Sequence, residues 1–194
     1  MIEVKVQEAH ENYPIKKIIL NDSDCNMDRS IWVHSRTTCL DRNDNFIYEE
    51  ITVINRINRI CITSIYTGEK YNLVAYTEQH SRREVKNDAC GSTVDHYILI
   101  NDQFVLMARD IDIYEHDLKS GRTDHFDKNG NLYFYRINNF DLLPPESSKE
   151  YDKDGNELDY WNLYFMEHED IYRTTGSVTR ELEQAVIEKY RMND

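Results

Sequence analysis

His125 to Arg136 read HFDKNGNLYFYR, and Glu150 to Trp161 read EYDKDGNELDYW, so the chain repeats one short pattern. A fainter echo, LDRNDNFIYE, spans residues 40–49. Each copy has an aromatic or apolar residue, an aspartate, a charged residue, Asn or Asp, a small turn residue, Asn and then a strand-like run. Gly130 and Gly155 can adopt the left-handed backbone conformation, and the opening aspartate can hydrogen-bond the turn backbone. The pattern predicts strand, turn, strand.

This turn resembles the D-x-x-G-N turns of bacterial β-hairpin repeat proteins, over one turn and its flanks at a time. The resemblance implies a hairpin and no particular activity. The rest of the chain favours the same architecture, because short apolar or alternating runs between turn residues are typical of strands that pair with their neighbours. We expect strands over residues 2–6, as an edge strand, and over 15–20, 31–33, 46–54, 59–66, 71–76, 94–100 and 104–114.

The C-terminal segment has helical periodicity. Residues 177–192 begin with Ser177 as a cap, carry acids early and bases late, and place apolar residues on one stripe. A weaker helix pattern covers residues 77–91, with Thr77 as its cap. The predicted fold class is α+β: mainly antiparallel β, a meander-like sheet with hairpins, and a C-terminal helix packed on the sheet. The predicted helix stripe consists of Val178, Leu182, Ala185, Val186 and Tyr190.

The chain is long enough for one domain or two small ones. Residues 1–140 are expected to form a mainly β domain. Residues 141–194 are expected to add an acidic hairpin and the helix, docked on the same core, so a single domain is favoured over two. The Pro144 and Pro145 pair ends any strand and marks residues 138–148 as a linker or crossover.

Charge is unevenly distributed along the chain. The formal net charge is −13, and residues 98–194 contain 21 acidic and 11 basic residues. Such a balance repels phosphate backbones and anionic membranes but speeds encounter with a basic protein surface. We therefore predict a basic protein partner, a nuclease or nucleic-acid-binding complex, with no direct nucleic acid and no membrane.

Cysteine usage and the first residues indicate the compartment. The four cysteines are far apart and lack C-x-x-C spacing, which is typical of reduced thiols. Residues 1–6 are too short and too charged for a secretory apolar region, and no apolar run is long enough for a membrane helix. The sequence predicts a cytoplasmic protein.

Acids and large aromatic rings are most concentrated between Lys149 and Asp170. Tyrosine and tryptophan are enriched at interface anchors, and surrounding acids would pair with arginine or lysine of a partner. The alternative is that the acids are the solvated side of a hairpin and Trp161 belongs to a core face. The predicted partner-binding residues are Asp152, Asp154, Glu157, Asp159, Tyr160, Trp161, Tyr164, Glu167, Glu169 and Asp170.

The sequence gives weaker support to metal binding and to catalysis. A calcium loop that began at Asp152 would need glycine at Glu157 and glutamate at Leu163, and the histidines and cysteines lack zinc-ligand spacing. We predict no metal and no cofactor. Cys90 and His96, with acids nearby, are the one local collection of nucleophile and base, but closeness in sequence is not geometry. No catalytic residue is assigned from the sequence.

Three functions follow as hypotheses. The first is an acidic cytosolic binding protein that inhibits a basic nucleic-acid-handling target, as a toxin-immunity protein or a phage anti-defence inhibitor that mimics nucleic acid. The second is a small hydrolase or nucleotide-processing enzyme that uses Cys90 and His96 or a carboxylate pair. The third is an assembly subunit with a symmetric apolar interface.

Overall fold

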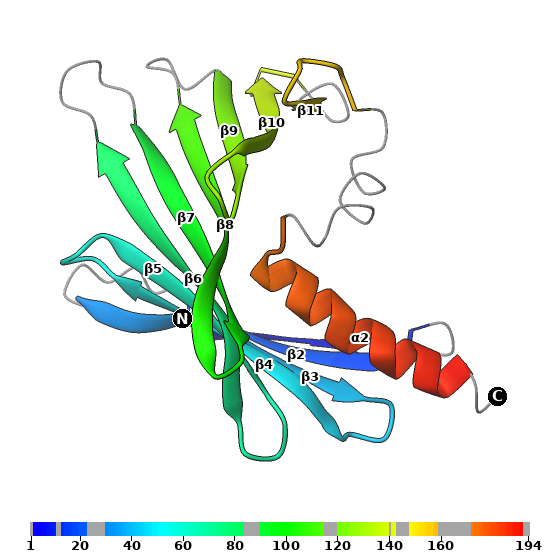
Figure 1. The fold of residues 1–194 in the computed structure, drawn as a ribbon. Coiled ribbons are helices and arrows are strands. Elements are labelled where there is room, and N and C mark those ends of the chain that lie inside the picture. Colours follow the sequence, from blue (N-terminus) through cyan, green and yellow to red (C-terminus); the bar gives the residue numbers. More distant parts are fainter. Residues whose placement is uncertain are drawn as a thin grey trace. The chain divides into compact units, whose positions relative to one another are not determined.

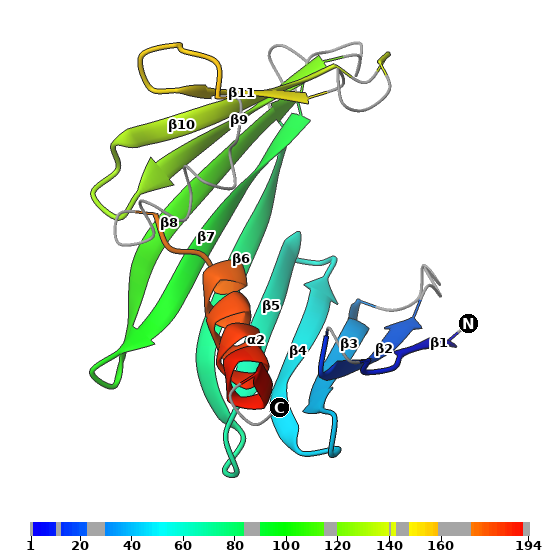
Figure 2. The same cartoon turned by 90° about the vertical axis from the view of Figure 1, so that its right-hand side faces the viewer.

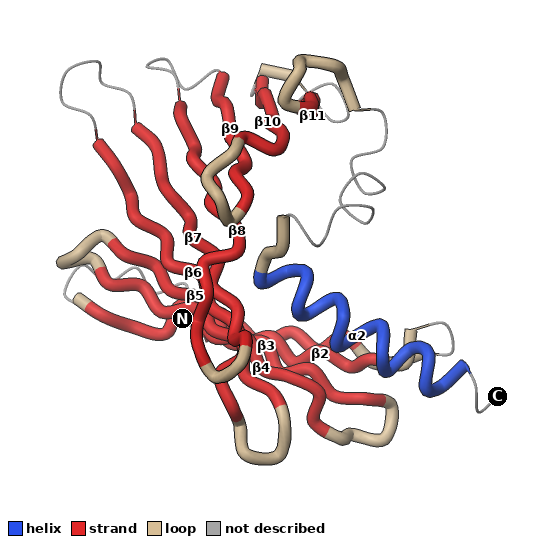
Figure 3. The backbone as a smooth tube through the Cα atoms, viewed as in Figure 1, coloured by secondary structure: helices blue, strands red, loops and turns tan. Residues whose placement is uncertain are grey.

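The structure, a computed structural model, describes residues 2–10, 13–22, 30–83, 90–114, 120–139, 141–142, 148–158 and 172–191, and at 82, 83 and 90 the backbone alone. Within these ranges, eleven strands form one sheet in which each strand is hydrogen-bonded to the next along the chain. Every pair with a defined register is antiparallel. The predicted antiparallel sheet with a C-terminal helix is confirmed, as Figure 3 shows in red and blue.

The elements follow the turn signals of the sequence. They are β1 (Ile2–Gln7), β2 (Ile15–Asp22), β3 (Ile31–Asp41), β4 (Phe46–Asn55), β5 (Ile60–Thr67), β6 (Asn72–Arg83), β7 (Cys90–Ile100), β8 (Gln103–Tyr114), β9 (Ser120–Asp127), β10 (Leu132–Asn139), β11 (Ser148–Asp152) and α2 (Thr175–Arg191). Figure 1 labels all of them except β1, which is labelled in Figure 2.

One predicted element is wrong. Residues 77–83, expected to begin a short helix, continue β6, and β7 begins at Cys90. The capping residue and acid at Thr77 and Glu78 are weak local signals, and pairing with neighbouring strands overrides such propensities. Residues 84–89 lie outside the described ranges.

The repeated pattern forms three turns with the same hydrogen bonds. Oδ1 of Asp127 accepts the backbone N–H groups of Asn129 at 2.8 Å and of Asn131 at 2.9 Å. The Asp152 carboxylate does the same with Asp154 and Asn156, and Asp41 with Asn43 and Asn45. The fourth position has positive φ in all three turns: 81° at Gly130, 89° at Gly155 and 62° at Asp44. The predicted strand–turn–strand device is confirmed at Asp127 and, in the faint third copy, at Asp41. The predicted turn at Asp152 also forms, but it is followed by an isolated bridge at Glu157, and residues 159–161 of that copy lie outside the described ranges.

The chain divides into two compact units. The first unit comprises Met1–Thr77, Ile98–Phe104 and Thr175–Asp194, and the second comprises Glu78–Tyr97 and Val105–Thr174. Strands β6, β7 and β8 therefore contribute residues to both. The predicted division into residues 1–140 and 141–194, docked on the same core, stays a prediction.

Helix α2 packs on the sheet of the first unit, over strands that include β2 and β4 (Figure 1). It begins two residues before the predicted start, and Val178 and Tyr190 are buried as expected. Ala185, predicted to face the sheet, is exposed. Glu183 faces the sheet instead and accepts hydrogen bonds from Tyr13 at 2.7 Å and Tyr48 at 2.6 Å. The inward face of α2 is therefore partly polar.

The polar contact beneath α2 is completed by a cation. Lys17 Nζ lies 2.7 Å from Glu183 Oε1, and both side chains are mostly buried. Burial alone would raise the pKa of Glu183, but the hydrogen bonds of Lys17, Tyr48 and Tyr13 outweigh it and lower the pKa below 4.5. Burial raises the pKa of the neighbouring Cys39 thiol to about 11. The contacts of Glu183 with Lys17, Tyr13 and Tyr48 therefore tie α2 to the sheet side of the first unit.

Candidate functional site

The described members of the predicted contact stretch are engaged within the chain. Asp152 holds its own turn, Asp154 forms an exposed ion pair with Lys153 at 2.7 Å, and Glu157 forms one with Lys149 at 2.9 Å. Exposed pairs of this kind contribute little to stability and exchange readily for a partner's cation. The remaining predicted residues lie outside the described ranges: Asp159, Tyr160, Trp161, Tyr164, Glu167, Glu169 and Asp170.

An aromatic surface adjoins these residues on β9, β10 and β11. Tyr135 and Tyr151 are register partners whose rings stack with centroids 5.2 Å apart. Arg122 lies over the Tyr135 ring, with its guanidinium carbon 4.0 Å from the centroid, and donates a hydrogen bond to Asp124. Ile137, on the same side of β10 as Tyr135, is 42% exposed. We call Arg122, Asp124, Tyr135, Ile137 and Tyr151 the Tyr–Arg face.

The Tyr–Arg face was not predicted from the sequence. The predicted aromatic anchors are Tyr160, Trp161 and Tyr164, whereas Tyr135 and Tyr151 belong to the two repeated segments. The missing signal was the register: Asp152 pairs with Phe134, which places Tyr151 beside Tyr135. A register of this kind depends on the loop between β10 and β11, which local patterns do not specify.

The opposite side of the second unit holds a buried polar group around Asp110. The carboxylate of Asp110 contacts His96 Nε2 at 3.1 Å and His125 Nδ1 at 2.9 Å, and it accepts a hydrogen bond from Tyr172 Oη at 2.5 Å. The His125 ring also stacks on Phe134, with centroids 3.9 Å apart. We call Asp110, His96, His125 and Tyr172 the Asp110 cluster.

The environment of the Asp110 cluster favours an ionised carboxylate. Burial by itself would raise the pKa of Asp110, but hydrogen bonds and charge from His125 and His96 outweigh it and lower the pKa. Burial first, and then the negative charge of Asp110, raise the pKa of Tyr172 well above its ordinary value. Tyr172 is therefore a hydrogen-bond donor to a fixed anion and not a base.

Further polar residues lie on the same side of the sheet as the Asp110 cluster. Ser92 donates a hydrogen bond to Asp112 at 2.7 Å, and Thr123 donates to the other oxygen of the same carboxylate at 2.7 Å. The Arg136 side chain donates a hydrogen bond to Oε1 of Glu150, and the Glu150 side chain is buried. Buried carboxylates with several donors make a polar core that specifies strand register. The hydrogen bonds given above stay within the second unit, whereas Nε2 of His125 and Oε2 of Glu150 are buried without a hydrogen-bond partner among the described residues.

The structure separates Cys90 from His96. Both lie on β7, where six residues of extended chain span about 20 Å. His96 is 8% exposed and directed to Asp110. Gly91 is explained by a close approach, since a Cβ there would lie 2.1 Å from the backbone oxygen of Asp112. These positions do not assemble a nucleophile and base.

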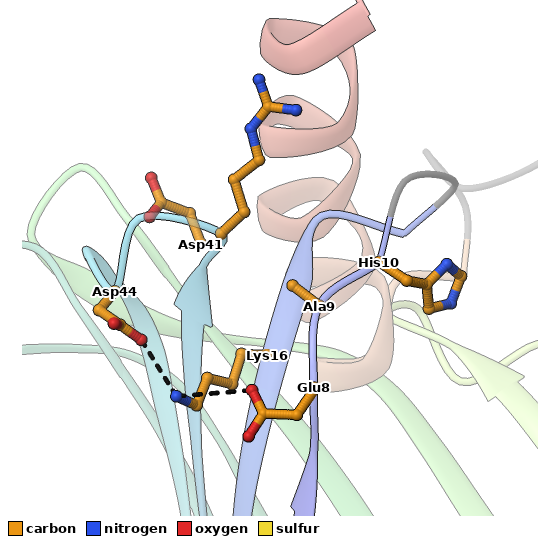
Figure 4. A pocket seen from close by; sticks show the side chains of 7 residues that line it. Glu8, Ala9, His10, Lys16, Asp41 and Asp44 are labelled. Carbon is orange, nitrogen blue, oxygen red and sulfur yellow. Dashed lines mark hydrogen bonds and ion pairs between the residues drawn. The ribbon is translucent and has the colours of Figure 1, made fainter.

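Described residues of the first unit line two open pockets. The one in Figure 4 has a volume of about 280 Å³, and Lys16 in it lies 3.2 Å from Asp44 and 3.6 Å from Glu8. The Lys16 ammonium is therefore already shared by two carboxylates, and Arg42 lines the same pocket. The second pocket, of about 370 Å³, lies against β1, β2 and β3 and is lined largely by apolar groups.

The described residues contain no group of three or more His, Cys, Asp or Glu side chains arranged to hold a metal ion, and no helix among them is long and apolar enough to cross a membrane. Comparison with protein-family models, with curated proteins and with solved structures finds no match to this chain.

Proposed function

We propose that this protein is an acidic binding protein that inhibits a basic, nucleic-acid-handling protein through its second unit. The observation that carries the proposal is where the charge lies. The second unit contains 20 acidic and 11 basic residues, a formal charge of −9, whereas the first unit contains 16 and 12, a charge of −4. A negative field concentrated on one unit steers a positively charged partner to that unit.

The Tyr–Arg face also belongs to the second unit, which supports this unit as the contact surface. Tyrosine and arginine are among the residue types enriched at interface anchors, and the tyrosine ring buries a large area at low entropic cost. Tyr135 and Tyr151 are held by their stack, and Arg122 is held against Tyr135, so little freedom remains to be lost on binding. The acids supply steering, and the rings supply anchors.

Inhibition by nucleic-acid mimicry is the specific form of the proposal. A protein that handles nucleic acid presents lysine and arginine to phosphates, and carboxylates can occupy the same positions. Residues 159–170 add four acids and no lysine or arginine to the second unit. Targets of this kind include a nuclease toxin, for an immunity protein, and a bacterial defence nuclease, for a phage anti-defence protein.

Affinity capture tests the proposal first. The tagged full chain, incubated with bacterial lysate that has been treated with nuclease, should retain a basic protein that elutes with rising salt and is identified by mass spectrometry. Single-stranded or duplex DNA added to the purified complex should compete with the protein for its partner. A retained partner that is acidic, or one whose binding DNA leaves unchanged, would reject mimicry.

A matched pair of charge variants locates the surface. Asp141, Asp154 and Glu157 are exposed acids of the second unit, and Glu69, Glu181 and Glu188 are exposed acids of the first. Changing either set to lysine alters the net charge equally. We expect the first triple variant to associate at least tenfold more slowly and with weaker salt dependence, and the second to associate nearly normally. Equal effects would mean that net charge, and not this unit, drives binding.

The hydrolase alternative gains no support from the described geometry. Its residues Cys90 and His96 lie far apart on one strand, and the Asp110 carboxylate is held by His96, His125 and Tyr172. Neither open pocket described above touches that cluster.

A further inference from the structure

Strand β1 is an open edge of the sheet. In the order of strands it is the first, and its partner among the described residues is β2 alone (Figure 2). The other terminal strand, β11, is treated differently: the returning chain forms a bridge between Tyr151 and Glu157, and the N–H of Leu158 donates to the Glu150 carbonyl at 2.8 Å. One edge is thus partly closed by its own chain, while six residues of β1 offer backbone groups to another strand.

The two faces of β1 differ in chemistry. Gln7 is the register partner of Lys17, which bonds Glu183 of α2, so Gln7, Lys5 and Glu3 lie on the helix side. Ile2, Val4 and Val6 lie on the other side and are 69%, 59% and 51% exposed. The apolar row continues into the second pocket, which Ile2 lines together with Leu20, Trp32 and Val33.

The charged side of β1 is complementary to itself. If two copies of β1 pair antiparallel about Val4, Glu3 of each copy lies opposite Lys5 of the other, and Ile2 lies opposite Val6. Both charged residues are exposed, with side-chain exposures of 58% for Glu3 and 66% for Lys5, and within one strand they form an ion pair with each other at 3.7 Å. An exposed pair of this kind contributes little to stability and can exchange for pairs across a dimer contact. Opposite charges and β-branched pairs directly across from each other stabilise antiparallel strands, whereas like charges destabilise them.

We propose that β1 is a self-association edge, and that a second copy of this chain adds its own β1 antiparallel to it about Val4. A twofold axis through the centre of this pair makes the interface isologous and closed, so that the product is a dimer and not a filament. The axis runs perpendicular to the sheet, and it therefore places both copies of α2 on the same side and joins the two apolar rows into one. This inference uses only the first unit and is independent of the proposed function.

The expected dimer is weak. One pair of six-residue strands buries less than the roughly 1,200–2,000 Å² of stable complexes, so association should depend on protein concentration. The backbone hydrogen bonds give the geometry, and the two symmetric Glu3–Lys5 pairs select the register. Sedimentation equilibrium of the full chain, from micromolar to near-millimolar concentration, measures the dissociation constant.

Charge exchange tests the register directly. Glu3→Lys places lysines opposite each other across the axis, and Lys5→Glu places glutamates opposite each other. Each single variant should weaken self-association about tenfold or more. The double variant Glu3→Lys/Lys5→Glu restores opposite pairs and should associate like the natural chain. An equimolar mixture of the two single variants should form mixed dimers more strongly than either variant alone.

Val33→Ser provides the matched control, since Val33 lies on the same apolar face but two strands away from the open edge. The dissociation constant of this variant should lie within about twofold of that of the natural chain. A natural chain that remains monomeric throughout the concentration range overturns the proposal. So does a dimer that survives both charge variants but is lost with Val33→Ser, because that result assigns the contact to stacking of sheet faces. Circular dichroism of each variant excludes unfolding as the cause.

Discussion

At the scale of single residues, the three aspartate turns show how a side chain and a φ angle together make a hairpin. Asp127 Oδ1 satisfies two backbone donors, and Gly130 supplies a φ of 81°. The third turn uses Asp44 in place of glycine at φ 62°. Asp and Asn tolerate this conformation because their short polar side chains can bond locally.

A substitution at Gly130 tests the cost of the positive φ alone, because a Cβ added there would meet no atom within 4 Å. Gly130→Ala should therefore destabilise the protein by about 1 kcal/mol through backbone strain alone. Gly130→Asn should cost roughly half as much. Urea unfolding of the two variants measures the difference. Equal losses would indicate that side-chain contacts, and not φ, determine the effect.

Glu183 links folding to pH. Its folded pKa is below 4.5, so the stability that it contributes is present above its unfolded pKa and is lost as pH falls through the folded value. Glu183→Gln should cost about 2 kcal/mol at pH 7, since Lys17 then lacks its anion. Measured by urea unfolding, this difference between natural chain and variant should shrink below about pH 4. A difference that is constant down to pH 3 would contradict the assignment.

At the scale of elements, α2 shows why a helical stripe does not fully define an inward face. Val178 and Tyr190 are buried as predicted, yet Ala185 is exposed and Glu183 lies against β2 and β4. The direction of the stripe depends on which sheet residues it meets. Here Tyr13, Lys17 and Tyr48 provide donors for a carboxylate.

The different exposures of Leu182 and Ala185 allow a matched test of how α2 is oriented on the sheet. Leu182 is half-buried on the sheet side, and Ala185 is exposed one turn away. Leu182→Asp should destabilise by about 3 kcal/mol or more, because it brings an unpaired charge against the sheet. Ala185→Asp should cost less than about 1 kcal/mol. Similar losses in urea unfolding would mean that α2 is rotated from the described orientation.

Strand β7 carries a second element-level constraint. Gly91 approaches the Asp112 backbone of β8 so closely that a Cβ would lie 2.1 Å from the carbonyl oxygen. Gly91→Ala should therefore push the strands apart and cost about 1 to 3 kcal/mol. Thermal unfolding measures the loss, with Ser92→Ala as a neighbour that removes a hydrogen bond but adds no atoms. A Gly91→Ala variant as stable as the natural chain would show that β7 shifts freely.

At the scale of the whole molecule, the unequal charge of the units should appear in their response to salt. The second unit carries −9 and the first −4, and self-repulsion destabilises the more charged unit more. Raising salt from low to physiological strength should slow amide hydrogen exchange in β9 and β10 more than in β3 and β4. Sucrose, which stabilises through exclusion, serves as the control and should slow both. Equal salt effects would count against charge repulsion in the second unit.

The sequence by itself determined the local elements: period-two runs and aspartate turns specified the hairpins, and because such turns join adjacent strands, they also specified a meander. The exception is residues 77–83, where the local sequence predicted a helix but pairing with neighbouring strands outweighed that weak signal. Only the tertiary structure decided that Asp110, His125 and Tyr172 meet, that Tyr135 stacks on Tyr151, and that Glu183 faces the sheet. The physical reason is range. A turn is fixed by interactions within five residues, whereas lateral register and helix docking are chosen by the total burial and hydrogen bonding of segments far apart in the chain.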